Sequence, residues 1–186
     1  MKNVMILISG MPGTGKTTFA AWLSSEFRFP LVCYDNITKA TAKLAKNMYD
    51  DPSLYPPIVG AIPYNFLWFN TEEILKTSSP LIVEYFFNEM SRATIDKLTA
   101  DYQYKVINVH FDVDAGIAYK RFMDRNEKDS KEKGIRPMEL SLADFTEGVK
   151  DNKEFRYGDN IVYVDTSDFS NVSYEDIAKQ VRKYMD

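Results

Sequence analysis

Eight residues near the N-terminus have the types and spacing of a phosphate-binding loop. They run Gly10-Met11-Pro12-Gly13-Thr14-Gly15-Lys16-Thr17, a G-x-x-x-x-G-K-T pattern whose glycines let backbone amides turn inward around a β-phosphate. The Lys16 ammonium can reach the β- and γ-phosphate oxygens, and the Thr17 hydroxyl can hold Mg²⁺. The candidate nucleotide-binding residues are Gly10, Pro12, Gly13, Thr14, Gly15, Lys16, Thr17 and Thr18.

Carboxylates follow three of the apolar runs that resemble strands, namely Asp35, Glu84 and Asp165. In a parallel sheet they would lie at the same edge as the loop. Asp35 follows the strand expected to neighbour the first one, so we interpret it as the base that accepts the proton of the acceptor hydroxyl. Glu84 is interpreted as a metal-linked or substrate-holding acid. Each could instead be a helix cap or a solvent-facing turn, and that alternative is favoured for Asp165, whose turn could also border the nucleotide base.

Two arginines four residues apart, Arg121 and Arg125, share one face of a predicted helix and lead into a charged run that contains Arg136. Guanidinium groups over a triphosphate would neutralise charge that develops on the transferring phosphoryl group, so Arg121 and Arg125 are predicted to be catalytic. All three are candidates for nucleotide binding. Residues 126–140, punctuated by Gly134 and Pro137, would form a lid. The alternative is exposed charge on an amphipathic helix and a solvated loop.

Strands and helices alternate along the chain. We expect strands at 4–8, 31–34, 80–83, 104–111 and 160–164, and helices at 17–27, 37–48, 71–76, 88–99, 115–127, 141–155 and 174–184. This alternation predicts an α/β fold of three layers, the P-loop NTPase fold, with a five-stranded, mainly parallel sheet and helices on both faces.

The segment 50–70 departs from the alternation, because it combines four prolines with a dense set of aromatic residues. It is either a proline-punctuated loop whose aromatic side chains fill the core, or a cap over the strand ends that supplies a substrate pocket. In the second case the aromatic side chains would stack on a planar ring of the substrate.

Composition limits the remaining possibilities. A chain of 186 residues with 45% hydrophobic content suits one domain, residues 1–186. A net charge of −4 argues against nucleic acid or an anionic membrane as partner. The single cysteine, Cys33, excludes an intramolecular disulfide and fits a reducing, cytoplasmic location, and no apolar run is long enough to span a membrane. The single histidine, His110, is interpreted as structural. Monomer and homodimer both stay open.

With these motifs in order, the chain resembles the small P-loop kinases of the nucleoside and nucleotide kinase-like group, particularly compact members labelled AAA-type ATPases. The layout is similar to chloramphenicol phosphotransferase, the kinase domain of polynucleotide kinase and zeta toxins. The resemblance implies ATP with Mg²⁺ and transfer of the γ-phosphate to a hydroxyl. It places the base on Asp35 and the lid contacts to phosphate on Arg121, Arg125 and Arg136.

One departure from the resemblance concerns the acceptor. Several such relatives have an arginine three positions after the aspartate, where this chain has Thr38, and Lys39 points about 100° away from that position around a helix. Phosphorylated or polynucleotide acceptors are therefore not expected. The leading hypothesis is a kinase for a small, nucleoside-like, aromatic or sugar acceptor. The alternatives are a nucleotide-binding switch or weak NTPase, and a 5′-hydroxyl nucleic-acid kinase.

Overall fold

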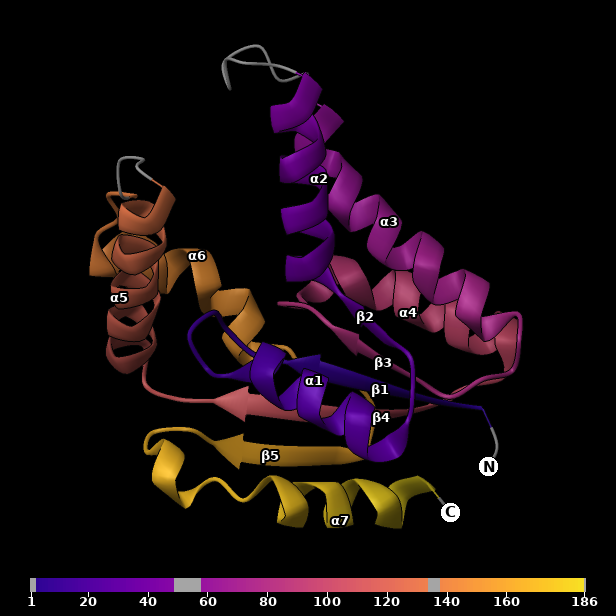
Figure 1. Cartoon of the computed structure of the whole chain (residues 1–186). Coiled ribbons are helices and arrows are strands. Elements are labelled where there is room, and N and C mark those ends of the chain that lie inside the picture. Colours follow the sequence, from indigo (N-terminus) through magenta and orange to yellow (C-terminus); the bar gives the residue numbers. More distant parts are fainter. Residues whose placement is uncertain (1–2, 49–57, 134–137, 186) are drawn as a thin grey trace.

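One parallel sheet forms the centre of the molecule. The computed structural model describes residues 3–48, 58–133 and 138–185. The strands are β1 (Val4–Ser9), β2 (Leu31–Cys33), β3 (Leu81–Glu84), β4 (Lys105–Asp112) and β5 (Ile161–Asp165). They pair in the order β2-β3-β1-β4-β5, and all four pairings are parallel (Figure 1). The predicted five-stranded parallel sheet is confirmed.

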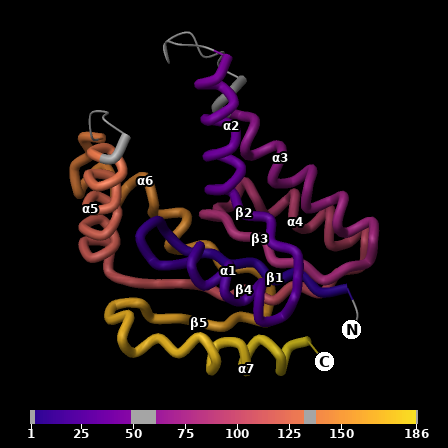
Figure 2. The backbone as a smooth tube through the Cα atoms, in the orientation of Figure 1, coloured from indigo at the N-terminus to yellow at the C-terminus, as the bar shows by residue number. Residues whose placement is uncertain are grey.

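Helices connect the strands and cover both faces of the sheet. They are α1 (Lys16–Phe27), α2 (Tyr34–Met48), α3 (Ile58–Leu75), α4 (Glu89–Tyr102), α5 (Ala115–Lys133), α6 (Leu142–Glu154) and α7 (Tyr174–Met185), with a short 3-10 helix at Phe169–Asn171. The backbone tube in Figure 2 shows α2 and α5 projecting from the same side of the sheet, with the loop that follows β1 between their bases.

Two hydrophobic clusters lie on opposite faces of β1, whose six residues are all buried. Val4, Ile6 and Ile8 pack into a cluster that includes residues of α1 and α7. Met5 and Leu7 pack into a second cluster with residues of α3 and α4. Successive residues of a strand point to opposite faces, so an unbroken apolar strand must be covered on both sides. This arrangement confirms the predicted three layers.

The segment expected to be a loop before a short helix at 71–76 is largely one helix, α3. Residues 49–57 of the predicted cap lie outside the described residues. The helix forms because Leu67, Thr71 and Leu75 recur every fourth residue and are all buried. Pro63 lies inside α3. Although α3 has 18 residues, no helix in the described ranges is both long and apolar enough to cross a membrane.

Two other helices have bounds that differ from expectation and that matter for the site. α2 begins at Tyr34 rather than at residue 37, so Asp35 lies in the first helical turn. α5 continues to Lys133, so the predicted lid is helical from residue 126 to residue 133. Residues 134–137, including Gly134, Arg136 and Pro137, lie outside the described part of the chain.

Candidate functional site

The loop between β1 and α1 has the conformation that the glycine pattern predicts. Gly10 has a φ of 126°, and a Cβ there would lie 2.1 Å from the carbonyl oxygen of Phe111. Gly13 has a φ of 84°, and its Cβ would lie 2.5 Å from the carbonyl oxygen of Ala118. Only glycine combines positive φ with such close approach to backbone. The loop is therefore packed directly against β4 and α5.

Polar side chains of the loop point back onto it. The Lys16 ammonium and the Thr14 hydroxyl donate to the carbonyl oxygen of Met11, at 2.8 and 2.9 Å. Lys16 is buried, and burial lowers the pKa of its ammonium, while the carboxylates of Glu84 and Asp35 act in the opposite direction. The loop thus holds one buried cation next to two acids, beside the N-terminus of α1, where backbone amides favour an anion.

A cavity of about 190 Å³ brings the predicted groups together. Asp35, Glu84 and Arg125 line it together with the phosphate-binding loop. The full lining is Pro12, Gly13, Gly15, Lys16, Thr17, Thr18, Asp35, Glu84, Phe86, Phe122 and Arg125. Phe86 and Phe122 are additions that sequence reasoning missed. Asp35 reaches the cavity from α2, and Arg125 reaches it from α5.

Glu84 is the last residue of β3 and is 4% exposed. The Cys33 thiol donates to its Oε2 at 3.1 Å, and the Thr17 hydroxyl also hydrogen-bonds to its carboxylate. Burial raises the pKa of the Glu84 carboxyl, while the Lys16 charge opposes that rise. The carboxylate is thus fixed beside the hydroxyl that the loop motif assigns to Mg²⁺.

The contact between Cys33 and Glu84 was not predicted from the sequence. The contact arises because Cys33 and Glu84 are register partners at the ends of β2 and β3. The expectation that β2 would neighbour β1 is wrong, since β3 lies between them. Strand order is a long-range property, so a short apolar run followed by Asp35 carried no signal that could have revealed this pairing.

The two arginines of α5 have different contacts, although both also line the larger cavity described below. Arg121 donates to the carbonyl oxygens of Thr166 and Ser167 at 2.7 and 3.0 Å. Its guanidinium carbon also lies 4.1 Å from the ring centre of Phe169. Arg125, by contrast, lines the cavity at the phosphate-binding loop. Arg121 is therefore held by hydrogen bonds against the loop that follows β5.

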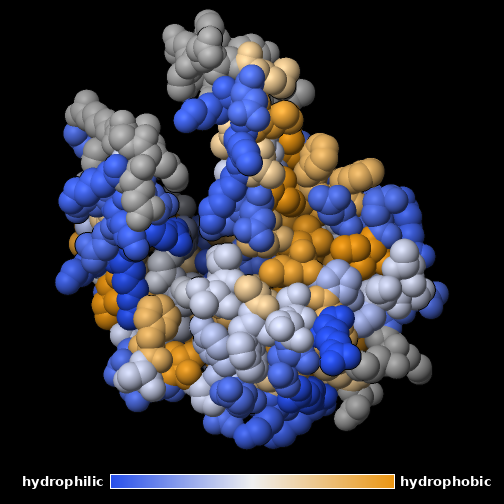
Figure 3. All heavy atoms as spheres, in the orientation of Figure 1, coloured by the Kyte–Doolittle hydropathy of each residue, from blue (hydrophilic) through white to orange (hydrophobic). Residues whose placement is uncertain are grey.

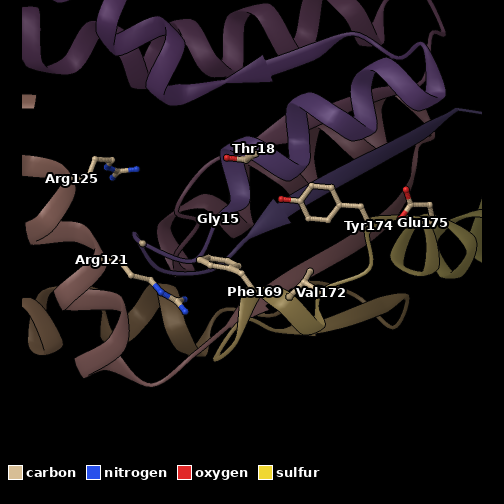
Figure 4. Close-up of a pocket in the computed structure, with 9 residues that line it drawn as sticks. Gly15, Thr18, Arg121, Arg125, Phe169, Val172, Tyr174 and Glu175 are labelled. Carbon is tan, nitrogen blue, oxygen red and sulfur yellow. The ribbon is translucent and has the colours of Figure 1, made fainter. Parts of the chain in front are cut away.

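A second, larger cavity of about 550 Å³ extends from the phosphate-binding loop toward that segment. It is lined by Gly13, Gly15, Thr18, Arg121, Arg125, Phe169, Val172, Tyr174 and Glu175, and Figure 4 shows Phe169 between Arg121 and Tyr174. The Phe169 ring lies against Gly15, since a Cβ on that glycine would be 2.9 Å from the ring. Phe169 and Tyr174 were missed as cavity residues, because neither belongs to a motif.

His110 lies behind the loop rather than in either cavity. Its Nδ1 is 2.9 Å from the Ser9 hydroxyl, which also accepts a bond from the Asn108 side chain at 2.7 Å. Burial lowers the pKa of His110 to about 3. The neutral ring helps to fix the last residue of β1, directly before Gly10. Among the described residues there is no group of three or more His, Cys, Asp or Glu side chains that could hold a metal ion.

Comparison with known proteins identifies the family. Residues 6–142 match the family model described as AAA domain. No curated protein sequence matches the chain. Among solved structures, a candidate kinase from Chloroflexus aurantiacus J-10-fl is similar over 100% of both chains, with a TM-score of 0.80 and 22% identity.

Two further solved structures share the fold. An APS kinase from Mycobacterium tuberculosis, in complex with AMPPNP and APS, aligns over 99% of this chain and 98% of its own, with a TM-score of 0.61 and 13% identity. A gluconokinase from Sinorhizobium meliloti 1021 aligns over 98% and 91%, with a TM-score of 0.58 and 14% identity. The three-layer fold is thus one that small kinases use.

Proposed function

Because the chain belongs to the AAA domain family and has the fold of small P-loop kinases, we propose that it transfers the γ-phosphate of ATP to a hydroxyl group of a small molecule in the presence of Mg²⁺. One observation carries this proposal. The cavity is lined by Lys16 and Thr17 of the phosphate-binding loop, by Asp35 of α2 and by Arg125 of α5. It therefore joins the groups for phosphate binding to a base for the acceptor.

The two cavities suggest how the nucleotide lies. Its phosphates would lie on the loop, where backbone amides at the start of α1 and the Lys16 ammonium favour negative charge. Its nucleoside would lie in the larger cavity, which is continuous with the loop through Gly13, Gly15 and Thr18. In this arrangement Arg121 contributes to the base end of the site, and Arg125 contributes at the phosphates.

Thr17 and Glu84 fit the metal that such a transfer needs. Mg²⁺ in kinases commonly takes one or two carboxylates, while phosphates and water complete its shell. The Thr17 hydroxyl hydrogen-bonds to the Glu84 carboxylate, so both would lie at the β- and γ-phosphate end of a bound nucleotide. The ion would neutralise negative charge on the phosphates. A buried carboxylate whose pKa is raised by desolvation would also be stabilised in its charged form by a cation.

The transfer requires one bond to form and one to break. The acceptor oxygen attacks the γ-phosphorus, its proton passes to the Asp35 carboxylate, and the bond from the γ-phosphorus to the bridging oxygen breaks, which leaves ADP. Lys16 and Arg125 stabilise the negative charge that develops on the phosphoryl and bridging oxygens. Phe86 and Phe122, which also line the cavity, exclude water from the reacting atoms.

Transfer of label from γ-labelled ATP to a panel of small alcohols tests this function. Asp35→Asn keeps the shape of the side chain but removes the base, so transfer should fall by about 10²–10⁴-fold. Asp159→Asn is a matched control, because Asp159 is exposed in the connection before β5. An Asp35→Asn protein with full transfer activity would contradict the assigned base.

The alternatives give different results in the same assay. A nucleotide-binding switch or weak NTPase would release phosphate at a rate that no alcohol changes and that Asp35→Asn does not lower. A 5′-hydroxyl nucleic-acid kinase would label an oligonucleotide in preference to every small alcohol, and the oligonucleotide would compete with them. Acceptor-dependent labelling that oligonucleotides leave unchanged would support the small-molecule kinase.

A further inference from the structure

We propose that the acceptor is an anionic alcohol, whose phosphate or carboxylate group binds Lys39 while its hydroxyl lies at Asp35. The inference rests on the proposed kinase function and adds the chemical class of the substrate. It comes from α2, the helix that carries the candidate base.

Lysines follow the candidate base along one face of α2. After Asp35, the lysines are Lys39, Lys43 and Lys46, at steps of four, four and three residues. Such steps place side chains on the same side of a helix. Asp35 lines the cavity and is half-buried, whereas all three lysines are exposed. The three lysine ammonium groups therefore follow Asp35 along α2, away from the cavity where the reaction would occur.

The opposite stripe of α2 is the one that packs. Ile37, Thr41 and Ala45 are its least exposed members after the first turn, and Ile37 packs against the core cluster that includes residues of α3. Residues four apart define this stripe. It lies on the other side of α2 from Asp35 and Lys39, so Lys39 is free of the packed face while Asp35 lines the cavity.

The charge of α2 contrasts with that of the protein. The chain has a net charge of −4, yet α2 has three lysines and a single acid, Asp35. Figure 3 shows hydrophilic side chains along α2 at the edge of a hollow between α2 and α5. On α5, Arg125 lines the cavity and Lys128 follows three residues later, also exposed. The two helices that supply Asp35 and Arg125 to the cavity therefore both carry exposed cationic side chains, which would attract an anionic ligand.

The sequence argued against such a ligand because Thr38 stands where several relatives have an arginine, but the start of α2 gives Lys39 a fixed position relative to Asp35. If the helix began at residue 37, Asp35 would lie outside it, and no cation would have a fixed relation to it. Because α2 begins at Tyr34, Lys39 lies one turn beyond Asp35, about 6 Å along the axis. A flexible lysine at that distance can bind an anion on the same molecule as the reacting hydroxyl. This spacing suits a sugar acid, a sugar phosphate or a nucleoside monophosphate.

Matched pairs of alcohols that differ in charge test the proposal. The probes are ribose and ribose 5-phosphate, glucose and gluconate, and uridine and uridine 3′-monophosphate, each with γ-labelled ATP. In at least one pair, kcat/KM for the anionic member should exceed that for the neutral member by tenfold or more. Lys39→Glu should reduce this ratio about tenfold, mainly through a higher KM for the anionic member, and raised salt should reduce it in the wild type.

Lys183→Glu on α7 is the charge-matched control, because Lys183 is exposed near the C-terminal end of a helix that does not line the phosphate-loop cavity. It should leave the ratio unchanged. Equal use of neutral and anionic members, or a ratio that Lys39→Glu does not change, would contradict the inference and leave the kinase function intact. Labelling of a 5′-hydroxyl oligonucleotide alone would contradict the small anionic acceptor. Transfer to no alcohol at all would contradict the kinase function itself.

Discussion

The buried thiol beside Glu84 gives a quantitative prediction about cysteine reactivity. Cys33 is 3% exposed and donates to the Glu84 carboxylate. Burial, and then the charge and hydrogen bond of Glu84, raise the pKa of the Cys33 thiol from its ordinary value of 9.0 to about 12. The thiolate is the reactive form, so its fraction at pH 8 falls from about one in ten to about one in ten thousand. The native thiol should therefore react about a thousandfold more slowly than an unperturbed one.

The assay is alkylation by iodoacetamide at pH 8, followed by mass spectrometry. Cys33 is the only cysteine, so every modified molecule reports on this site. The same protein in denaturant supplies the unperturbed rate. Glu84→Gln removes the negative charge that helps to raise the pKa of the thiol, so native Cys33 should react faster in this variant. A native rate within tenfold of the denatured rate would refute the assigned thiol–carboxylate contact, as would an unchanged rate in Glu84→Gln.

Other parts of the structure give three further expectations. Gly10→Ala should abolish nucleotide binding, measured by calorimetry, because the new Cβ would collide with the backbone of β4. Gly148→Ala is the matched control in α6, where the new Cβ would have no atom within 4 Å. It should raise the free energy of unfolding by about 0.5–1 kcal/mol in urea titrations. A Gly10→Ala protein that binds ATP normally would contradict the loop geometry. Burial lowers the pKa of His110 to about 3, so between pH 6.5 and 3 the unfolded state binds a proton that the folded state does not. The free energy of unfolding should therefore fall by up to about 1.4 kcal/mol for each unit by which the pH decreases in this range. Thermal unfolding should show a smaller decrease in the His110→Asn variant. In steady-state kinetics, Arg125→Ala should mainly lower kcat, whereas Arg121→Ala should mainly raise KM for ATP; the reverse pattern would exchange their roles.

Local patterns were enough to predict most of the fold. Residues 4–8 are apolar throughout and are followed by glycines and then by helical spacing, and each of these features depends on neighbouring residues alone. The error at 58–70 has a local cause as well. Prolines and aromatic residues suggested a loop, but the buried stripe through Leu67, Thr71 and Leu75 has helical spacing and outweighs one internal proline.

The site was predictable where it depends on a motif and not where it depends on strand order. The phosphate-binding loop places Lys16 and Thr17, and strand ends place Asp35 and Glu84 near it. The thiol contact of Glu84 required knowledge that β2 pairs with β3. The separate environments of Arg121 and Arg125 required the position of the segment after β5, which lies far away in sequence. Helical spacing alone gave both arginines the same role.

The central position of β1 also constrains how the protein acquires its activity during folding. Met5 pairs with Leu81 on one side and with Val106 on the other, so both partners are distant in sequence. Closing such long loops costs conformational entropy before the strand pairing contributes favourable free energy, so topologies of this kind fold slowly. The phosphate-binding loop cannot reach its packed conformation until β4 has been made, because Gly10 packs against the backbone of Phe111. Nucleotide binding should therefore appear only after β4 has been synthesised and has paired with β1.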